Sequence, residues 1–159
     1  MRNELRRASC ANYVLPQNVN FTGGTIHIID SVLTIPDNAT YTLQQSNLTA
    51  AAGAVQVAGL NQTLDTTQNL TIFAPSNDAF NAVGSIFANI SMQQLASSLE
   101  YHVVRGLDYS SSLMNGTLQT LSGGSINITS INGTVFVNDA KVTIPDILLK
   151  NGVLHVIDQ

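Results

Sequence analysis

Charged residues are scarce in this chain. They make up 10% of its 159 positions, against roughly a quarter in typical soluble domains. The six Lys and Arg residues leave a net charge of −4 at pH 7, and Arg2, Arg6 and Arg7 all lie within the first seven positions. Binding to nucleic-acid phosphates needs several clustered cations. The composition therefore predicts a protein that does not bind nucleic acid.

Cysteine, tryptophan and long apolar runs are also lacking. Cys10 is the single cysteine, so no disulfide can form within the chain and the fold must rest on its apolar core. No stretch reaches the ~18 apolar residues that a membrane-spanning helix needs. The charged start, MRNELRRASC, precedes no apolar segment and does not read as a signal peptide. Any membrane attachment is thus expected through an anchor outside this chain.

The polar surface comes instead from Asn, Ser, Thr and Gln, and the asparagines form an excess of N-glycosylation sequons. Asn-x-Ser/Thr occurs nine times, whereas the 16 Asn residues and the Ser and Thr content predict about three by chance. The nine positions are Asn20, Asn38, Asn47, Asn61, Asn69, Asn89, Asn115, Asn127 and Asn132. This excess indicates a secreted eukaryotic glycoprotein. The alternative is that Asn- and Thr-rich turns create the motif without being modified.

One octapeptide occurs almost twice, as GGTIHIID at 23–30 and as NGVLHVID at 151–158. Each copy follows a strand-like segment that ends in proline, ANYVLP at 11–16 and AKVTIP at 140–145. The spacing is 128 residues between the glycines and 129 between the prolines, a period typical of tandem domains rather than of solenoid repeats. We therefore expect residues 1–36 to be the C-terminal tail of a preceding domain. Residues 37–159 would form a second, nearly complete copy.

The pattern of elements predicts an α+β fold. Apolar spacing within 43–60 favours a helix that Ser46 or Asn47 can cap and Gly59 can end, and a strand is expected over 70–74. Further helices are expected from Ser76 or Asn77 and from Ser91, where hydroxyl or amide side chains can act as N-caps. The last third alternates as strands, with Asn-Gly at 132–133 predicting a hairpin turn. Helices followed by antiparallel strands favour α+β over alternating βαβ units.

The histidines are interpreted as structural. His27 and His155 hold equivalent places in the repeated octapeptide, each between aliphatic residues on a strand, where a ring N–H can satisfy a buried carbonyl. His102 follows Tyr101 and is expected to form a hydrogen-bonded pair with it. No His, Cys and Asp cluster has the spacing of a metal site, so neither metal nor cofactor is expected.

No acidic or hydroxyl residue has a clear catalytic setting. Ser76, Asp78 and His102 could be assembled into a hydrolase triad only on paper, because Ser76 lies in APSND rather than in a Gly-x-Ser-x-Gly turn. Asp158 is expected to bond backbone at a strand end, as is Asp30. Asp146 follows Pro145 in a connection between strands and is the acid most expected to be exposed. The chain is therefore predicted not to be an enzyme.

Three segments together resemble the fasciclin-like domain family. They are LTIFAPSNDAF at 70–80, EYHVV at 100–104 and the closing NGVLHVID, and their order and spacing resemble the family over residues 38–159. Residues 23–36 look like the end of a preceding fasciclin-like domain. The low charge and the many sequons are most similar to fungal members. The resemblance implies a β-wedge or sandwich with helices packed over one side.

It also implies a secreted or cell-surface protein, often tandem and lipid-anchored, that acts in adhesion or matrix interaction. The expected partners are other cell-surface or matrix proteins or glycans, bound through weak multivalent contacts. In animal members the Tyr-His region and an Asp-Ile pair are implicated in integrin contact; the matching residues are Tyr101, His102, Asp146 and Ile147. The alternative is a cell-wall domain that binds carbohydrate or a small ligand in a cleft between helices and wedge. Such a site would need exposed aromatic residues, and the absence of Trp and the presence of only four Tyr residues give it little support.

Overall fold

The computed structural model describes residues 14–29, 35–87, 90–131 and 133–159. Its helices are α1 (Ala39–Gln45), α2 (Thr49–Val57), α3 (Asn61–Thr66), α4 (Asn77–Phe87) and α5 (Met92–Tyr101). Its strands are β1 (Val14–Phe21), β2 (Gly24–Ile29), β3 (Leu70–Pro75), β4 (Val103–Arg105), β5 (Gly116–Gln119), β6 (Ser125–Ile131), β7 (Thr134–Val137), β8 (Ala140–Leu149) and β9 (Gly152–Ile157). The expected α+β class is confirmed.

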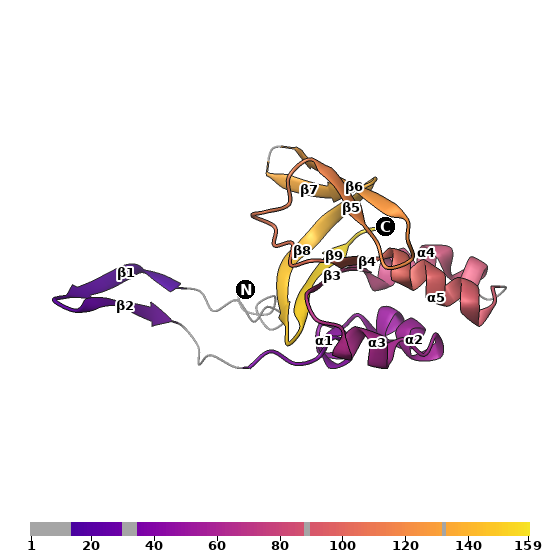
Figure 1. Ribbon diagram of the computed structural model, residues 1–159, viewed down its shortest axis with the longest axis horizontal. Coiled ribbons are helices and arrows are strands. Elements are labelled where there is room, and N and C mark those ends of the chain that lie inside the picture. Colours follow the sequence, from indigo (N-terminus) through magenta and orange to yellow (C-terminus); the bar gives the residue numbers. More distant parts are fainter. Residues whose placement is uncertain (1–13, 30–34, 88–89, 132) are drawn as a thin grey trace.

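Seven strands form one curled sheet in the order β4-β3-β9-β8-β7-β6-β5 (Figure 1). Neighbouring strands are antiparallel except β3 and β9, which pair in parallel from Leu70↔Gly152 to Pro75↔Ile157. A single bridge, Val104↔Thr120, links strand β4 to the residue that follows β5. The two ends of the sheet therefore meet, which gives the expected wedge.

Two apolar clusters lie on the two faces of the central strands. Because side chains alternate along a strand, Ile72 of β3 belongs to the first cluster and Phe73 to the second. The first joins α1, α2, α3 and α5 to β3, β8 and β9, and the second fills the space inside the curled sheet. Every residue of β9 is buried, since it has neighbours on both faces and both edges. The repeated closing segment is thus the centre of the domain.

The helix expected within 43–60 is present as α2, although the predicted residues do not cap it. It is separated from α1 at Ser46–Leu48, where Asn47 takes a left-handed backbone conformation with φ 59°. Neither Ser46 nor Asn47 caps α2, because the amide of Ala50 is bound by the Asn77 side chain, 27 residues along the chain. A cap supplied from so far away leaves no local signal in the sequence.

The other helix starts are local, as predicted. Ser76 precedes α4, and its hydroxyl accepts from the Ala79 amide at 3.2 Å. Ser91 and Gln94 form a reciprocal capping box at the start of α5. The expected hairpin between β6 and β7 is also present, with Gly133 at φ 78°.

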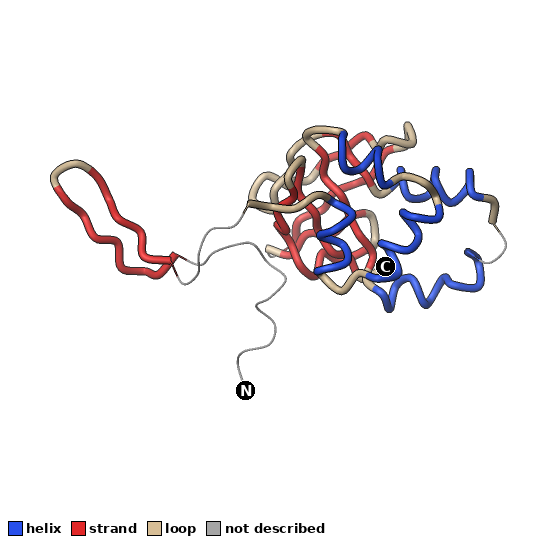
Figure 2. The backbone as a smooth tube through the Cα atoms, turned by 90° about the horizontal axis from the view of Figure 1, so that it is seen from below, coloured by secondary structure: helices blue, strands red, loops and turns tan. Residues whose placement is uncertain are grey.

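The first two strands form a separate hairpin, which stands apart from the curled sheet in Figures 1 and 2. The apolar side chains that the structure describes in this hairpin are exposed, with Phe21 at 57% and Ile26 at 52%. Its pairing repeats that of β8 and β9 at a spacing of 128 residues. The shared pairs are Val14↔Ile29 with Val142↔Ile157, Val19↔Ile26 with Ile147↔Leu154, Asn20↔Thr25 with Leu148↔Val153, and Phe21↔Gly24 with Leu149↔Gly152. The β1–β2 hairpin carries one register shift, between Val14 and Asn18, and the β8–β9 hairpin carries two between Val142 and Ile147.

Candidate functional site

Tyr101 lies at the end of α5, against the β6–β8 region of the sheet. Its hydroxyl donates to the Ser125 carbonyl at 3.1 Å and accepts from the Asn138 side chain at 3.2 Å. Asn138 also accepts from the Asn127 amide, so the three residues form one chain of hydrogen bonds. The Tyr101 ring is therefore held by the sheet and not by its neighbour in sequence.

His102 is half-buried and bonds within its own helix. Its Nδ1 donates to the Ser98 carbonyl at 2.8 Å, which leaves the Nε2 lone pair facing away from that bond. The rings of Tyr101 and His102 meet edge to face at 6.2 Å. The expected hydrogen bond between the two residues is wrong, because each side chain finds a backbone carbonyl elsewhere.

His102 lines three cavities, two of which are large. One, of about 210 Å³, is lined by polar groups of Tyr101, Asn138 and Asp139 together with apolar residues. The other, of about 410 Å³, lies between α4 and α5 and is mainly apolar, with Phe80 and Leu99 in its wall. Gln159 lines both cavities. In this part of the described surface, two cavities lie beside the His102 ring, whose Nε2 is not used in the bond to Ser98.

Asp146 is half-buried in β8, not exposed as expected. It takes a left-handed conformation with φ 60°, and its carboxylate accepts from both the amide and the hydroxyl of Ser110, the amide bond being 2.8 Å. Its own amide donates to Nδ1 of His155 at 3.2 Å. The register of β8 shifts between Ile144 and Ile147, and the Asp146 carboxylate holds the loop that contains Ser110.

His155 is fully buried, and its role as a structural residue is confirmed. Because Nδ1 accepts from Asp146, Nε2 carries the hydrogen and donates to the Asp108 carbonyl at 2.8 Å. The ring stacks on Phe73 at 5.4 Å. Burial lowers the pKa of His155 below its usual 6.5, although the Asp108 carbonyl and the nearby carboxylates of Asp146 and Asp108 oppose this effect.

The four residues implied by the resemblance fall into two separate groups. Tyr101 and His102 lie at the α5–β4 junction, whereas Asp146 and Ile147 lie in β8, and the two groups share no hydrogen-bond partner. The Ile147 side chain is 0% exposed and belongs to the core. The binding role of the four residues stays a prediction, with Tyr101, His102 and Asp146 the members that reach the surface.

The sequon asparagines that are described lie at the surface. Asn20, Asn47, Asn69, Asn115 and Asn127 are exposed, and Asn38 and Asn61 are half-buried. Asn47 and Asn69 both have positive φ, as turn residues often do. Asn89 and Asn132 lie outside the described residues.

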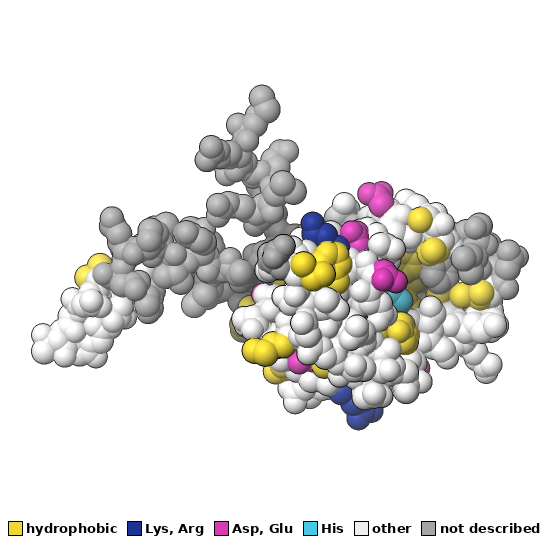
Figure 3. All heavy atoms as spheres, turned by 90° about the horizontal axis from the view of Figure 1, so that it is seen from above, with side chains coloured by type: hydrophobic (Ala, Val, Ile, Leu, Met, Phe, Trp, Pro, Cys, Tyr) yellow, Lys and Arg dark blue, Asp and Glu magenta, His cyan; other side chains and the backbone are white. Residues whose placement is uncertain are grey.

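Figure 3 shows how few charged side chains are present on one face of the molecule.

No catalytic or metal constellation is present in the part of the chain that the structure describes. It has no cluster of three or more His, Cys, Asp and Glu side chains able to hold a metal. The Ser76 hydroxyl is used as a helix cap, as argued from the sequence. Asp158 binds the Lys141 amide at 2.8 Å, as predicted for a strand end. Within the same described ranges, no helix is long and apolar enough to cross a bilayer.

Two asparagines of the family-like segments have roles that the sequence analysis missed. Asn77 accepts from Ala50 and donates to the Asn47 carbonyl, so it ties α4 to the α1–α2 turn. Asn151 is buried and donates to the carbonyls of Leu64 and Thr67, which joins the start of β9 to the end of α3. In the sequence, these two roles are indicated only by the position of Asn77 and Asn151 inside the segments 70–80 and 151–158, which resemble the family.

The geometry defines an α+β wedge whose distinctive residues mainly hold the fold together. The Fasciclin domain model matches residues 46–159, and the chain therefore belongs to the fasciclin domain family. It is 36% identical over 145 residues to a fasciclin-like arabinogalactan protein of Arthroderma benhamiae, covering 91% of this chain but 34% of that protein. It is 36% identical over 135 residues to protein sll1483 of Synechocystis, covering 82% of this chain and 73% of the relative.

A solved structure has the same fold. It is described as a FAS1 domain pair from the insect cell adhesion molecule fasciclin I, and it aligns with a TM-score of 0.63 and 23% identity. The alignment covers 91% of this chain and 57% of that one. The chain thus spans only part of the length of the fungal relative and of the domain pair.

Proposed function

We propose that this chain is an extracellular, non-enzymatic adhesion module that binds cell-surface or matrix components through weak, multivalent contacts. Membership of the fasciclin domain family carries the proposal. The domain pair with the same fold comes from a protein described as a cell adhesion molecule. The excess of sequons supports a secreted location at the cell surface or in a cell wall.

The β1–β2 hairpin supports the multivalent part of this proposal. Its register repeats that of β8 and β9, but among the described residues no strand lies beside the edge of β2 that corresponds to the β3-facing edge of β9. The exposed Ile26 of β2 corresponds to Leu154 of β9, which is fully buried between β3 and β8. We infer that residues 1–36 end a preceding fasciclin domain and that residues 37–159 form the next. Copies in one protein raise the effective concentration of weak sites.

Surface density distinguishes weak multivalent contacts from a single strong site. Linked weak sites can gain about 10²–10⁴ in avidity without any new contact. Beads that carry the unglycosylated chain at increasing density should attach to cell walls or matrix steeply above a threshold. The soluble chain should compete poorly. Attachment that rises in simple proportion to density, with full competition by soluble chain at low concentration, would contradict the proposal.

The same assay tests the residues implied by the family resemblance. His102→Ala should reduce attachment at least tenfold if the α5–β4 junction makes the contact, because the Nε2 lone pair and part of both cavity walls are lost. Met92→Ala is the matched control, since this side chain is 69% exposed at the other end of the same helix. Equal attachment by both variants would remove the junction from consideration.

The 410 Å³ cavity favours a second function, binding of a small ligand. Its wall of Phe80, Val83 and Leu99 suits an apolar molecule better than a sugar. The ring nitrogen of His102 could accept from a hydroxyl on such a ligand. A shift of the His102 ring resonances in NMR spectra on addition of a long-chain alcohol would support this function. Shifts with oligosaccharides alone would favour carbohydrate binding.

A further inference from the structure

Some of the described asparagines use the side-chain nitrogen Nδ2 inside the fold, and others do not. Three of them donate through Nδ2: Asn77 to the Asn47 carbonyl at 2.7 Å, Asn138 to the Tyr101 hydroxyl at 3.2 Å, and Asn151 to the Leu64 carbonyl at 2.6 Å. The partners determine the amide orientation. Backbone N–H groups bind Oδ1 of Asn77 and Asn138, and two carbonyls accept from Asn151. None of the three lies in a sequon.

No described sequon asparagine donates through Nδ2, and the same holds for Asn81, which is exposed and lies outside any sequon. Three of the sequon asparagines accept through Oδ1: Asn20 from the Thr25 hydroxyl at 3.0 Å, Asn38 from the Tyr41 amide at 2.9 Å, and Asn115 from the Ser130 amide at 2.7 Å. The side chains of Asn47, Asn61, Asn69 and Asn127 make no hydrogen bond within the described part of the chain. The Nδ2 atoms of all seven described sequons are therefore left unused by the fold.

This division matches the chemistry of N-glycosylation. The side-chain nitrogen forms a bond to the anomeric carbon of an activated, phosphate-linked oligosaccharide. The bond from that carbon to the phosphate carrier breaks, and one Nδ2 proton is lost. Oδ1 is untouched and can still accept, so a cap such as that of Asn38 survives the modification. An Nδ2 that donates inside the fold, as in Asn151, has no room for a sugar.

We propose that Asn20, Asn38, Asn47, Asn61, Asn69, Asn115 and Asn127 carry N-linked oligosaccharides in the folded protein. The proposal rests on the extracellular location in the proposed function. The seven positions lie on the β1–β2 hairpin, around α1–α3 up to the start of β3, and on the β5–β6 ribbon (Figure 1). No described residue of α5, β4, β8 or β9 is a sequon asparagine. These elements, which carry no described sequon, include Tyr101, His102 and Asp146.

The test is occupancy, site by site, in the full chain secreted from eukaryotic cells. Enzymatic release of the sugars in H₂¹⁸O converts each modified Asn to ¹⁸O-labelled Asp, which mass spectrometry locates. We expect label at all seven positions. Unmodified asparagine at most of them would overturn the proposal.

Two engineered sequons separate the use of Nδ2 from simple exposure. Ala140→Ser creates a sequon at Asn138, whose Nδ2 is bonded to Tyr101, and Val83→Thr creates one at Asn81 on the exposed side of α4. Secreted, folded V83T should be labelled at Asn81, whereas folded A140S should be unlabelled at Asn138. Full label at Asn138 in folded A140S would overturn the argument. Urea unfolding of bacterially made A140S shows whether the serine itself is tolerated.

Failure of this proposal is distinguishable from failure of the proposed function. The bead assay uses unglycosylated protein, so it reports adhesion whether or not the asparagines carry sugar. A chain that is secreted bare but still attaches at high density would contradict the glycan assignment alone.

Discussion

At the residue scale, the side chains that looked most like candidates for chemistry are mostly used to connect distant segments. His155 joins the Asp146 amide to the Asp108 carbonyl, and Asn151 joins β9 to α3. A buried polar group without partners costs about 1–3 kcal/mol, so the bonds of the His155 ring and of the Asn151 side-chain nitrogen stabilise the fold; Oδ1 of Asn151 is buried without a partner in the described part of the chain. Such residues are indispensable to the fold without touching any ligand.

His155 should make the domain less stable at mildly acidic pH. Its pKa in the folded state lies below the unfolded value of 6.5, because burial disfavours the charged ring. Between those two values the unfolded chain binds more protons, so the free energy of unfolding falls as the pH decreases below about 6.5. Above that range the ring is neutral in both states and contributes no pH dependence. Urea unfolding at pH 7.5 and 5.5 measures the difference.

The control for this prediction is His155→Gln, which cannot titrate. The variant should be less stable at pH 7.5, because glutamine replaces the imidazole imperfectly between Asp146 and Asp108. Its loss of stability between pH 7.5 and 5.5 should nevertheless be smaller than in the wild type. The same loss in both proteins would show that other groups cause the pH dependence.

At the scale of elements, the repeated octapeptide is explained by what surrounds β9. This strand lies between β3 and β8 and is buried along its whole length. Gly152 is needed where β3 comes close, because an added Cβ would lie 2.1 Å from the Leu70 carbonyl oxygen. At the equivalent Gly24, the nearest atoms to such a Cβ are those of the Phe21 ring, at 3.6 Å. Within the described residues no third strand lies beside β2, so no close backbone requires a glycine at Gly24.

Alanine at the two glycines should therefore have unequal effects. Gly152→Ala should cost about 3 kcal/mol or more, because the backbone of β3 must move away from β9. Gly24→Ala should change the free energy of unfolding by no more than about 0.5 kcal/mol. Chemical denaturation of both variants checks the pair. A large effect of Gly24→Ala would mean that β2 packs against this domain.

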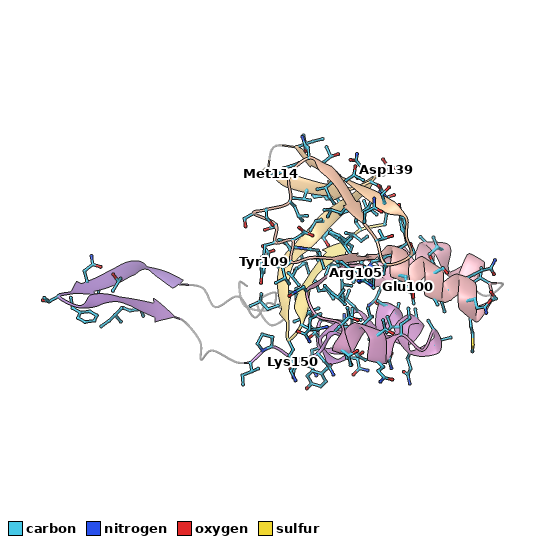
Figure 4. All side chains as sticks on the ribbon, viewed as in Figure 1. Glu100, Arg105, Tyr109, Met114, Asp139 and Lys150 are labelled. Atoms are coloured by element: carbon cyan, nitrogen blue, oxygen red, sulfur yellow. The ribbon has the colours of Figure 1, made fainter. Side chains whose placement is uncertain are left out.

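At the scale of the whole molecule, the described chain is a closed domain preceded by a hairpin. Residue Asp37 marks the start of the domain, since its carbonyl accepts from the Lys150 amide at the turn between β8 and β9; Figure 4 places Lys150 near the point where the chain enters α1. The apolar side chains of β1 and β2 that the structure describes, Val19, Phe21, Ile26 and Ile28, are exposed and belong to neither core cluster. The free energy of unfolding of residues 37–159 should therefore not depend on the β1–β2 hairpin.

Removal of residues 1–34 should leave that stability unchanged. We expect a shift within about 0.5 kcal/mol in urea unfolding, since the described hairpin adds no side chain to the core. Leu154→Ala in the full chain is the positive control and should cost about 2–5 kcal/mol, because this leucine is 0% exposed. A truncated chain that loses more than about 1 kcal/mol would show that the N-terminal segment supports the domain.

What the sequence determined by itself is local or is repeated within the chain. The Ser91 capping box, the Asn-Gly hairpin and the echo of the closing segment depend on residues close together or on a comparison of the chain with itself. Only the tertiary structure decided that β3 and β9 pair in parallel, that Asn77 caps α2 and that Asp146 is half-buried. Each of these depends on a partner 27 or more residues away, and no periodicity or propensity in the chain records which distant groups will meet.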